Sequence, residues 1–299
     1  MGLQISNAFA PGITIKSGIS PTGSYNILSN GILDIAKYSS INVDIKDLLD
    51  IRLQSTLSIS SYENYNITHI APFAFAGQYI SAINLPNVIT IGQGAFYDTK
   101  YLSSINFPKC TFIASNAFSP CPSLTTVILP NLENLLSGTF TNCYKLTSVD
   151  LAKCKILGYQ ALYGCSSLTT VNVPQCISTN YCTFAYCLSL SSIALPNCQY
   201  LSQYTFGWCR NLHTVELGSQ CSYIGFSAFA GCYNLLSLYL NVTSVPVING
   251  TGAFSSTPIS NYTTSTGGVY GKIYVPSSLY AAFITANTWS TYSARMVSM

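Results

Sequence analysis

A 22-residue repeat is the feature that most constrains this chain of 299 residues. One marker is a grid of cysteines spaced eleven residues apart, interrupted once, at Leu132. The grid comprises Cys110, Cys121, Cys143, Cys154, Cys165, Cys176, Cys187, Cys198 and Cys209. The second marker has the full period and comprises Phe75, Phe96, Phe118, Phe140, Phe184, Phe206, Phe229 and Phe254, with Leu162 in its one gap. Such repeats form solenoids, because a single unit cannot bury a core without stacked neighbours.

One unit reads "LTTVNVPQCISTNYCTFAYCLS", and its core pattern is L-x-x-V-x-V-x-x-C. Alternate residues of a strand point to opposite faces, so Val171 and Val173 are predicted to face inward and Thr170 and Asn172 outward. Pro174 follows and ends the strand, since it has no N–H for a ladder. Stacked units would place like residues about 4.8 Å apart in a parallel sheet. The repeated phenylalanines would then form a buried aromatic spine.

This unit closely resembles the BspA-like (Treponema-type) leucine-rich repeat, as "FAYCLSLSSIALPNC" and "FAGCYNLLSLYL" show. The resemblance covers residues 62–260, and its departures are local: Leu162 replaces Phe, and Gln78 and Thr99 replace the first Cys. It implies an α/β-type repeat solenoid, a leucine-rich repeat with a parallel β-sheet on one face that is otherwise mostly β and irregular coil. It also implies recognition or adhesion at a cell surface.

The two ends of the chain depart from the repeat and divide it into four predicted parts. Residues 1–50 form a small β module for attachment or capping, with a hairpin turn at Asn30-Gly31. They resemble β modules that precede repeat arrays in gut-bacterial and prophage-type proteins. Residues 51–61 are a linker, 62–266 the solenoid and 267–299 a strand–helix cap. In this cap Ser277 or Ser278 is expected to cap a helix, with Trp289 packed nearby.

The cysteines could be disulfides, metal ligands, catalytic thiols or small core residues. Cys165 and Cys176 flank a strand and lie about 20 Å apart, whereas a disulfide needs Cα atoms within about 6.8 Å. Cys165 and Cys187 share a ladder, but their side chains run parallel, which leaves their Cβ atoms slightly too far apart for a relaxed disulfide. We predict that most are free buried thiols, with one or two bridges as the alternative.

No cofactor or metal site is predicted, and an enzyme is not expected. There is no C-x-x-C motif, and only two histidines occur, His69 and His213. His213 is expected at the surface, and Glu216 nearby does not make it a catalytic base. Charged residues make up 7% of the chain, with a net charge of +3 and no basic run, so no nucleic-acid partner is expected. No apolar run approaches the roughly 20 residues of a membrane span.

The outward positions of the predicted sheet form two rows. The first is small and suggests a structural hydroxyl ladder: Ala82, Ser104, Thr126, Ser148, Thr170, Ser192, Thr214 and Ser237. The second changes chemistry from unit to unit: Asn84, Asn106, Ile128, Asp150, Asn172, Ala194, Glu216 and Tyr239. The extended face of a solenoid is a natural ligand surface, so Asn84, Asn106, Asp150, Asn172, Glu216 and Tyr239 are the candidate ligand-binding residues.

Two other interpretations of the surface remain open. The second row can be solvated surface without a ligand. Tyr186 and Trp208, in the turns, form a rival surface, because exposed aromatic rings suit glycan stacking or protein hot spots.

The predicted function is non-enzymatic recognition or adhesion, with a cell-surface protein or glycan as partner. One version is a phage or prophage tail-associated receptor-binding protein, whose residues 1–50 contact other virion or assembly proteins. The alternatives are a bacterial cell-surface adhesin and a structural scaffold within a larger assembly. The N-terminus lacks a basic start followed by an apolar segment, so no signal peptide is expected in this chain. The expected location is extracellular, at a cell surface or on a virion.

Overall fold

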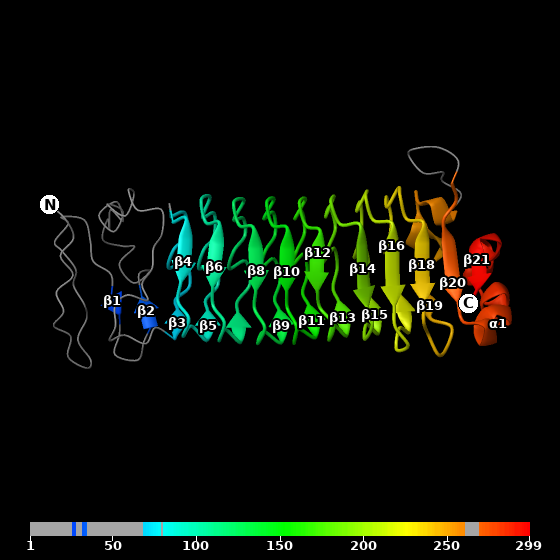
Figure 1. The fold of residues 1–299 in the computed structure, drawn as a ribbon, viewed down its shortest axis with the longest axis horizontal. Coiled ribbons are helices and arrows are strands. Elements are labelled where there is room, and N and C mark those ends of the chain that lie inside the picture. Colours follow the sequence, from blue (N-terminus) through cyan, green and yellow to red (C-terminus); the bar gives the residue numbers. More distant parts are fainter. Residues whose placement is uncertain (1–25, 28–31, 35–67, 79, 261–268) are drawn as a thin grey trace.

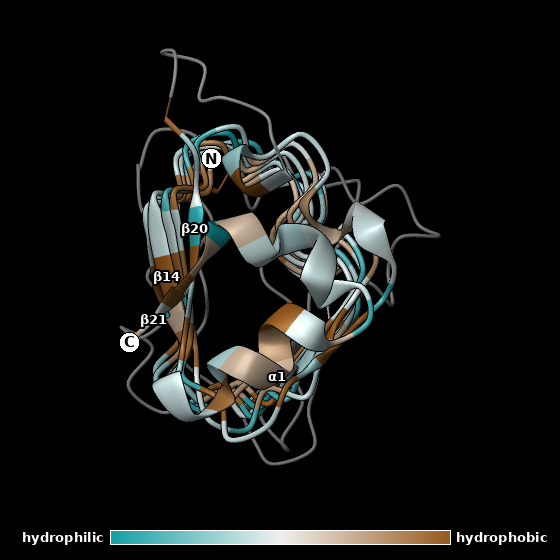
Figure 2. Cartoon of the chain, turned by 90° about the vertical axis from the view of Figure 1, so that its right-hand side faces the viewer, coloured by the Kyte–Doolittle hydropathy of each residue, from teal (hydrophilic) through white to brown (hydrophobic). Residues whose placement is uncertain are grey.

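The protein is a solenoid of stacked coils whose strands run parallel (Figure 1). A computed structural model describes residues 26–27, 32–34, 68–78, 80–260 and 269–299. Each coil contributes one longer and one shorter strand, joined by turns. The coils stack along the long axis of the molecule. Seen along that axis, the coils superimpose closely (Figure 2). The predicted leucine-rich-repeat solenoid is confirmed.

The longer strands are the ones predicted from the L-x-x-V-x-V pattern. They are β4 (Ala82–Asn84), β6 (Ser104–Asn106), β8 (Thr126–Ile128), β10 (Ser148–Asp150), β12 (Thr170–Asn172), β14 (Ser192–Leu195), β16 (Thr214–Leu217) and β18 (Ser237–Leu240). Val171 pairs with Val149 in the neighbouring coil, and Asn172 pairs with Asp150. Thr170 and Asn172 are exposed while Val173 is buried, as the alternation predicted.

The shorter strands lie after the turn that follows each longer strand. They are β3 (His69–Ile70), β5 (Thr90–Ile91), β7 (Phe112–Ile113), β9 (Asn134–Leu135), β11 (Ile156–Leu157), β13 (Ser178–Thr179), β15 (Tyr200–Leu201), β17 (Tyr223–Ile224) and β19 (Val247–Ile248). Their pairing is also parallel from coil to coil. The second residue of each shorter strand is buried, because its side chain points into the interior of the coil.

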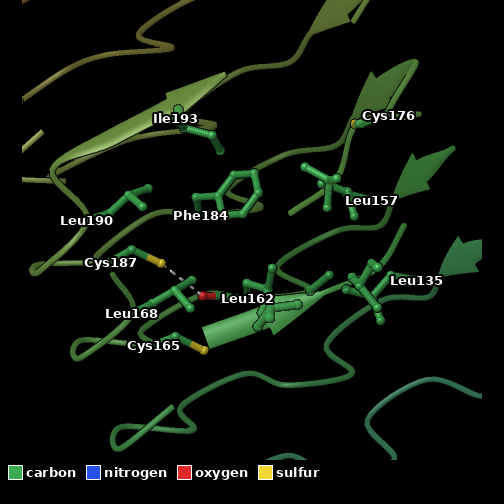
Figure 3. Close-up of a cluster of buried hydrophobic side chains, with 14 of the residues drawn as sticks. Leu135, Leu157, Leu162, Cys165, Leu168, Cys176, Phe184, Cys187, Leu190 and Ile193 are labelled. Carbon is green, nitrogen blue, oxygen red and sulfur yellow. Dashed lines mark hydrogen bonds between the residues drawn. The ribbon is translucent and has the colours of Figure 1, made fainter. Parts of the chain in front are cut away.

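The repeated phenylalanines form the predicted spine at the centre of the core. All are buried, and neighbouring rings stack with centroids 4.9 Å apart for Phe96 and Phe118 and 5.6 Å apart for Phe206 and Phe229. Leu162 interrupts the stack and is itself fully buried. Figure 3 shows Leu162 beside Phe184 among leucines and thiols of neighbouring coils.

All twelve cysteines are free and buried, and all but Cys182 form two ladders with different hydrogen bonds. In one ladder the thiol donates to a carbonyl about one coil back, as Cys187 does to the Leu162 oxygen at 3.3 Å (Figure 3). In the other ladder it donates to the carbonyl two residues ahead, as Cys154 does to the Ile156 oxygen. The thiols predicted to be free are therefore core residues whose S–H groups also donate hydrogen bonds to backbone carbonyl oxygens.

The predicted hydroxyl ladder is displaced by one residue. The hydroxyl of Thr147 donates to the carbonyl oxygen of Thr125 at 3.0 Å, and Thr169 repeats this toward Thr147 at 3.1 Å. The same carbonyls accept the backbone N–H groups of these residues. These residues precede the strand and lie along the stacking direction. The row predicted from the sequence, which includes Thr126 and Thr170, is the next one along each coil and is exposed or partly exposed.

Part of the predicted N-terminal β module is described. Strands β1 (Asn26–Ile27) and β2 (Ile32–Asp34) pair antiparallel, as a hairpin requires, and the predicted turn at Asn30-Gly31 lies outside the described residues. Strand β2 also pairs parallel with β3, so the hairpin continues the sheet of shorter strands. The other strands predicted within residues 1–50, and the predicted linker 51–61, lie outside the described residues.

The C-terminal segment closes the other end of the solenoid. It contains η4 (Thr251–Phe254), η5 (Pro258–Ser260), β20 (Lys272–Val275), η6 (Ser277–Leu279), α1 (Tyr280–Thr285), η7 (Trp289–Arg295) and β21 (Met296–Ser298). Strands β20 and β21 extend the sheet beyond β18. The strand and helix predicted here are confirmed, as is the packing of Trp289, which is buried against Phe283 with centroids 5.2 Å apart.

The predicted serine cap of this helix is wrong. Helix α1 follows directly from η6, and its N-cap residue is Leu279, which makes no side-chain cap hydrogen bond. Ser277 and Ser278 lie inside η6, where Pro276 is the N-cap residue. The 3-10 turn takes up the first residues of the expected helix and moves its start beyond both serines.

Candidate ligand-binding sheet face

The variable row predicted from the sequence lies along one exposed face of the longer strands. We call it the sheet-face row: Asn84, Asn106, Ile128, Asp150, Asn172, Ala194, Glu216 and Tyr239. Parallel register places Asp150 beside both Ile128 and Asn172, and Glu216 beside both Ala194 and Tyr239. Each member is exposed or partly exposed. The structure therefore brings the six candidate residues onto one continuous face.

Polar members of the row bond to one another across coils. The Asn106 amide donates to Asn84 Oδ1 at 2.8 Å, and the Asn172 amide donates to Asp150 Oδ1 at 2.8 Å. Each bond spans 22 residues, one full coil, and lies at the solvent-exposed face. Sequence reasoning missed these pairs. They hold the side chains in fixed positions along the face, which favours binding because less rotamer freedom is lost.

The C-terminal end of the face is aromatic. Tyr239 stacks on Tyr274 of β20, with ring centroids 4.5 Å apart and planes within 10°. Register makes Tyr274 the next member of the row after Tyr239. The sequence carries a signal for it, because "IYVP" at residues 273–276 repeats the "VNVP" pattern of residues 171–174. The face therefore extends one coil beyond the predicted residues.

One carboxylate lies next to this aromatic end. Glu216 Oε1 accepts a hydrogen bond from the Asn241 amide at 2.9 Å. Lys272 pairs with Ser237 in register, so a positive charge lies on the neighbouring outward row. The end of the face thus combines two stacked phenols with one charge of each sign, a mixture suited to specific polar contacts.

The histidine predicted from the sequence to lie at the surface is found there. His213 is exposed, and its Nδ1 lies within hydrogen-bonding distance of the Asn211 carbonyl oxygen. Among the described residues, no group of three or more histidine, cysteine or acidic side chains could hold a metal ion. Within the same residues, no helix is long and apolar enough to cross a membrane.

The rival surface in the turns is also present. Tyr186 and Trp208 stack with centroids 5.1 Å apart and planes within 9°. Both are partly exposed. They belong to the six-residue turns that follow the shorter strands, and so they lie apart from the sheet-face row along each coil.

Comparison with known proteins identifies the repeat. Residues 68–182 and 177–270 match the family model described as the BspA type leucine rich repeat region, in six copies. The two ranges together cover more than half of the chain. No curated protein matches the chain.

Several solved structures are similar to this chain. They include a leucine-rich repeat protein from Bacteroides ovatus, at 22% identity and a TM-score of 0.47, covering 61% of this chain and 57% of that one. The pneumococcal vaccine antigen PcpA matches at 12% identity and a TM-score of 0.46, covering 79% and 70%. A leucine rich cell surface protein from Faecalibacterium prausnitzii matches at 19% identity and a TM-score of 0.38, covering 72% and 78%. The present chain spans less than two thirds of the Bacteroides ovatus protein.

Proposed function

Because the chain belongs to the BspA-type leucine-rich repeat family, we propose that it is a non-enzymatic recognition protein whose sheet face binds a cell-surface partner. The observation that carries the proposal is the sheet-face row. The buried positions repeat from coil to coil, whereas this exposed row changes from amide to carboxylate to aromatic. A solenoid presents such a row as an extended surface, which suits a large ligand better than a small molecule.

The composition of the row indicates how binding would work. Asp150 and Asn172 are held together across coils, and Tyr239 is held by Tyr274. Preorganised polar and aromatic side chains lose little conformational entropy when a partner binds. Stacked tyrosines supply apolar area and a hydroxyl at the same place. We expect the aromatic end to contribute most of the affinity.

The test is a cell-binding assay with the labelled full chain, read by flow cytometry on panels of bacterial and epithelial cells. The test variant carries Asn172→Ala, Glu216→Ala and Tyr239→Ala. Its matched control carries Asn134→Ala, Glu133→Ala and Tyr200→Ala. These are three exposed residues of the same types that lie in or beside the shorter strands β9 and β15, away from the sheet-face row. We expect the test variant to lose binding and the control to keep it. Unaltered binding by the test variant contradicts the sheet-face proposal.

A narrower version places the protein on a phage or prophage tail, with residues 1–50 attached to other virion proteins. Its support is the resemblance of that segment to modules of prophage-type proteins. The alternatives are a bacterial surface adhesin and an assembly scaffold. Tail and lysis genes beside the coding sequence favour the phage version. Surface labelling of intact bacteria favours the adhesin, and a high, fixed copy number in purified particles favours the scaffold.

A further inference from the structure

The six-residue turn of most coils contains two positions that adopt left-handed backbone geometry. They lie two residues before and two residues after the residue of the buried spine. Glycine or asparagine holds several of them, including Gly138, Asn142, Gly164 and Gly231, with φ between 58° and 74°. This use is expected, since a side chain at positive φ is strained and small or short polar residues tolerate it best.

Three bulky aromatic residues occupy the same positions in two consecutive coils. Tyr186 has φ 61°, Tyr204 has φ 52° and Trp208 has φ 58°. An aromatic side chain at positive φ is an outlier for which glycine or asparagine would cost less. Strain of this kind persists where the residue has a role besides folding. The core does not need these rings, because Phe184 and Phe206 already fill it.

These three side chains belong to one partly exposed group. We call it the aromatic cluster: Tyr163, Tyr181, Tyr186, Tyr204, Trp208 and Phe226. Trp208 stacks on Tyr186 at 5.1 Å and lies parallel to Tyr204 at 5.7 Å, while Tyr163 meets Tyr186 edge-on at 5.4 Å. Tyr181 and Phe226 meet Tyr204 edge-on at 5.7 Å and 6.1 Å. Phe226 remains 43% exposed and Tyr181 38% exposed, so the cluster is a surface feature.

Glycines in neighbouring coils make room for the cluster. A Cβ added at Gly231 would lie 2.8 Å from Trp208 Cδ1, and one added at Gly252 would lie 2.6 Å from Phe226 Cε2. Gly164 and Gly231 hold the positions equivalent to Tyr186 and Trp208 in the coils before and after. The aromatic rings therefore lie against backbone that carries no side chain at these glycines, and not against large side chains.

Most of the cluster lies in a stretch of the chain that has no charged side chains. No charged residue occurs between Lys155 and Arg210, a stretch that contains five of the six rings. Exposed neighbours in or beside these turns include amides, such as Gln203 and Asn180. An acidic glycan or a phosphate would need several cations here.

We propose that the aromatic cluster is a binding site for a neutral carbohydrate. Sugar rings carry C–H groups that pack on tyrosine and tryptophan, and their hydroxyls can bond to phenolic oxygens and amides. The scarcity of charge along this stretch matches such a ligand, and Arg210, two residues after Trp208, lies over the Tyr233 ring at 5.9 Å. This site uses residues of the turns alone and does not depend on the sheet face.

The first measurement is a glycan array probed with the labelled full chain, with neutral, sialylated and sulfated glycans on one surface. The neutral hits are then titrated by calorimetry and by intrinsic fluorescence. Fluorescence is informative because the chain has two tryptophans, and Trp289 is buried in the C-terminal segment. We expect binding of neutral glycans, a shift in Trp208 emission and little dependence on salt.

Variants that copy other coils keep the test independent of folding. Trp208→Gly and Tyr186→Asn introduce residues that the same position holds elsewhere, and both relieve left-handed strain. We expect each to keep the Tm within about 4 °C and to weaken glycan binding at least about tenfold. Tyr200→Ser is the matched control, since Ser178 holds its position one coil earlier, and it should bind normally.

Three results would overturn the inference: no neutral glycan bound, only charged glycans or a protein bound, or unchanged glycan affinity in the folded cluster variants. The sheet-face triple variant separates the two proposals. If it alone loses glycan binding, the carbohydrate site is not the aromatic cluster and the sheet-face proposal stands. If it binds glycan normally while the cluster variants do not, the present inference stands.

Discussion

At the scale of single residues, cysteine serves this protein as a small apolar side chain with one weak hydrogen bond. Cys143 is fully buried and donates to the Phe118 carbonyl oxygen at 3.2 Å. Burial raises the pKa of Cys143 to about 12 and that of Cys110 to about 11, from an ordinary value of 9.0, because a thiolate is poorly solvated there. The thiols thus remain protonated in the folded protein.

This difference predicts loss of stability at alkaline pH. Below pH 9.0 the thiols are protonated in both states, and their contribution to stability is complete. Between that pH and the raised folded pKa values, the unfolded chain releases protons and the folded chain does not, which costs about 1.4 kcal/mol per thiol for each pH unit. We expect the Tm to fall steeply from about pH 9 to about pH 11.

The measurement is thermal unfolding followed by circular dichroism across that range, under reducing conditions. A chain with Cys143→Ala and Cys209→Ala should show a shallower fall, because two of the responsible groups are gone. A Tm independent of pH in this interval would mean that the thiols are not buried as described.

At the scale of elements, the turn and the spine residue act together. Phe206 is fully buried and stacks on Phe184 at 5.3 Å and on Phe229 at 5.6 Å, so each ring supports two neighbouring coils. Leu162 shows that this position accepts a smaller side chain without loss of the coil. The spine therefore requires apolar volume more than it requires an aromatic ring.

Phe206→Leu and Phe206→Ala test this requirement. Leucine keeps most of the buried volume and should lower the free energy of unfolding by about 1–2 kcal/mol. Alanine leaves a cavity between two rings and should cost about 3–5 kcal/mol. Urea unfolding of both variants measures the difference. Equal costs would show that ring stacking, and not filled volume, holds neighbouring coils together.

At the scale of the whole molecule, the C-terminal segment covers an end that would otherwise expose core. Trp289 packs on Phe254, the last ring of the spine, and its indole N–H donates to the Pro246 carbonyl oxygen at 2.7 Å. Tyr292 packs edge-on against Phe254, with centroids 5.1 Å apart. An array of repeats needs such a cover, because its terminal unit lacks one neighbour.

Removal of this cover is expected to loosen the array from its C-terminal end. Trp289→Ala should cost about 3–5 kcal/mol. Trp289→Phe keeps a ring but leaves the Pro246 carbonyl without its donor, at about 1–3 kcal/mol. Limited proteolysis with mass spectrometry should find the first new cleavages in the last coils of the alanine variant. First cleavage in the central coils instead would mean that the segment does not act as a cap.

Part of the candidate site could be predicted because strand alternation is a local property. The spacing of Val171, Asn172 and Val173 was enough to place Asn172 on the outer face, and its repetition placed the other members of the row. The Asn172–Asp150 bond was not predictable, since it depends on side-chain conformation across two coils. Tyr274 was missed because its coil departs from the 22-residue spacing.

The sequence by itself determined the repeat, the direction of its strands, the buried spine and the family, because each depends on a pattern that recurs at one period. Only the tertiary structure decided what depends on the turns. It moved the hydroxyl ladder by one residue, started helix α1 after Leu279 and gathered Tyr186, Tyr204 and Trp208 into one surface group. The physical reason is that backbone geometry at a turn, with its left-handed residues, sets side-chain direction in ways that periodicity does not encode.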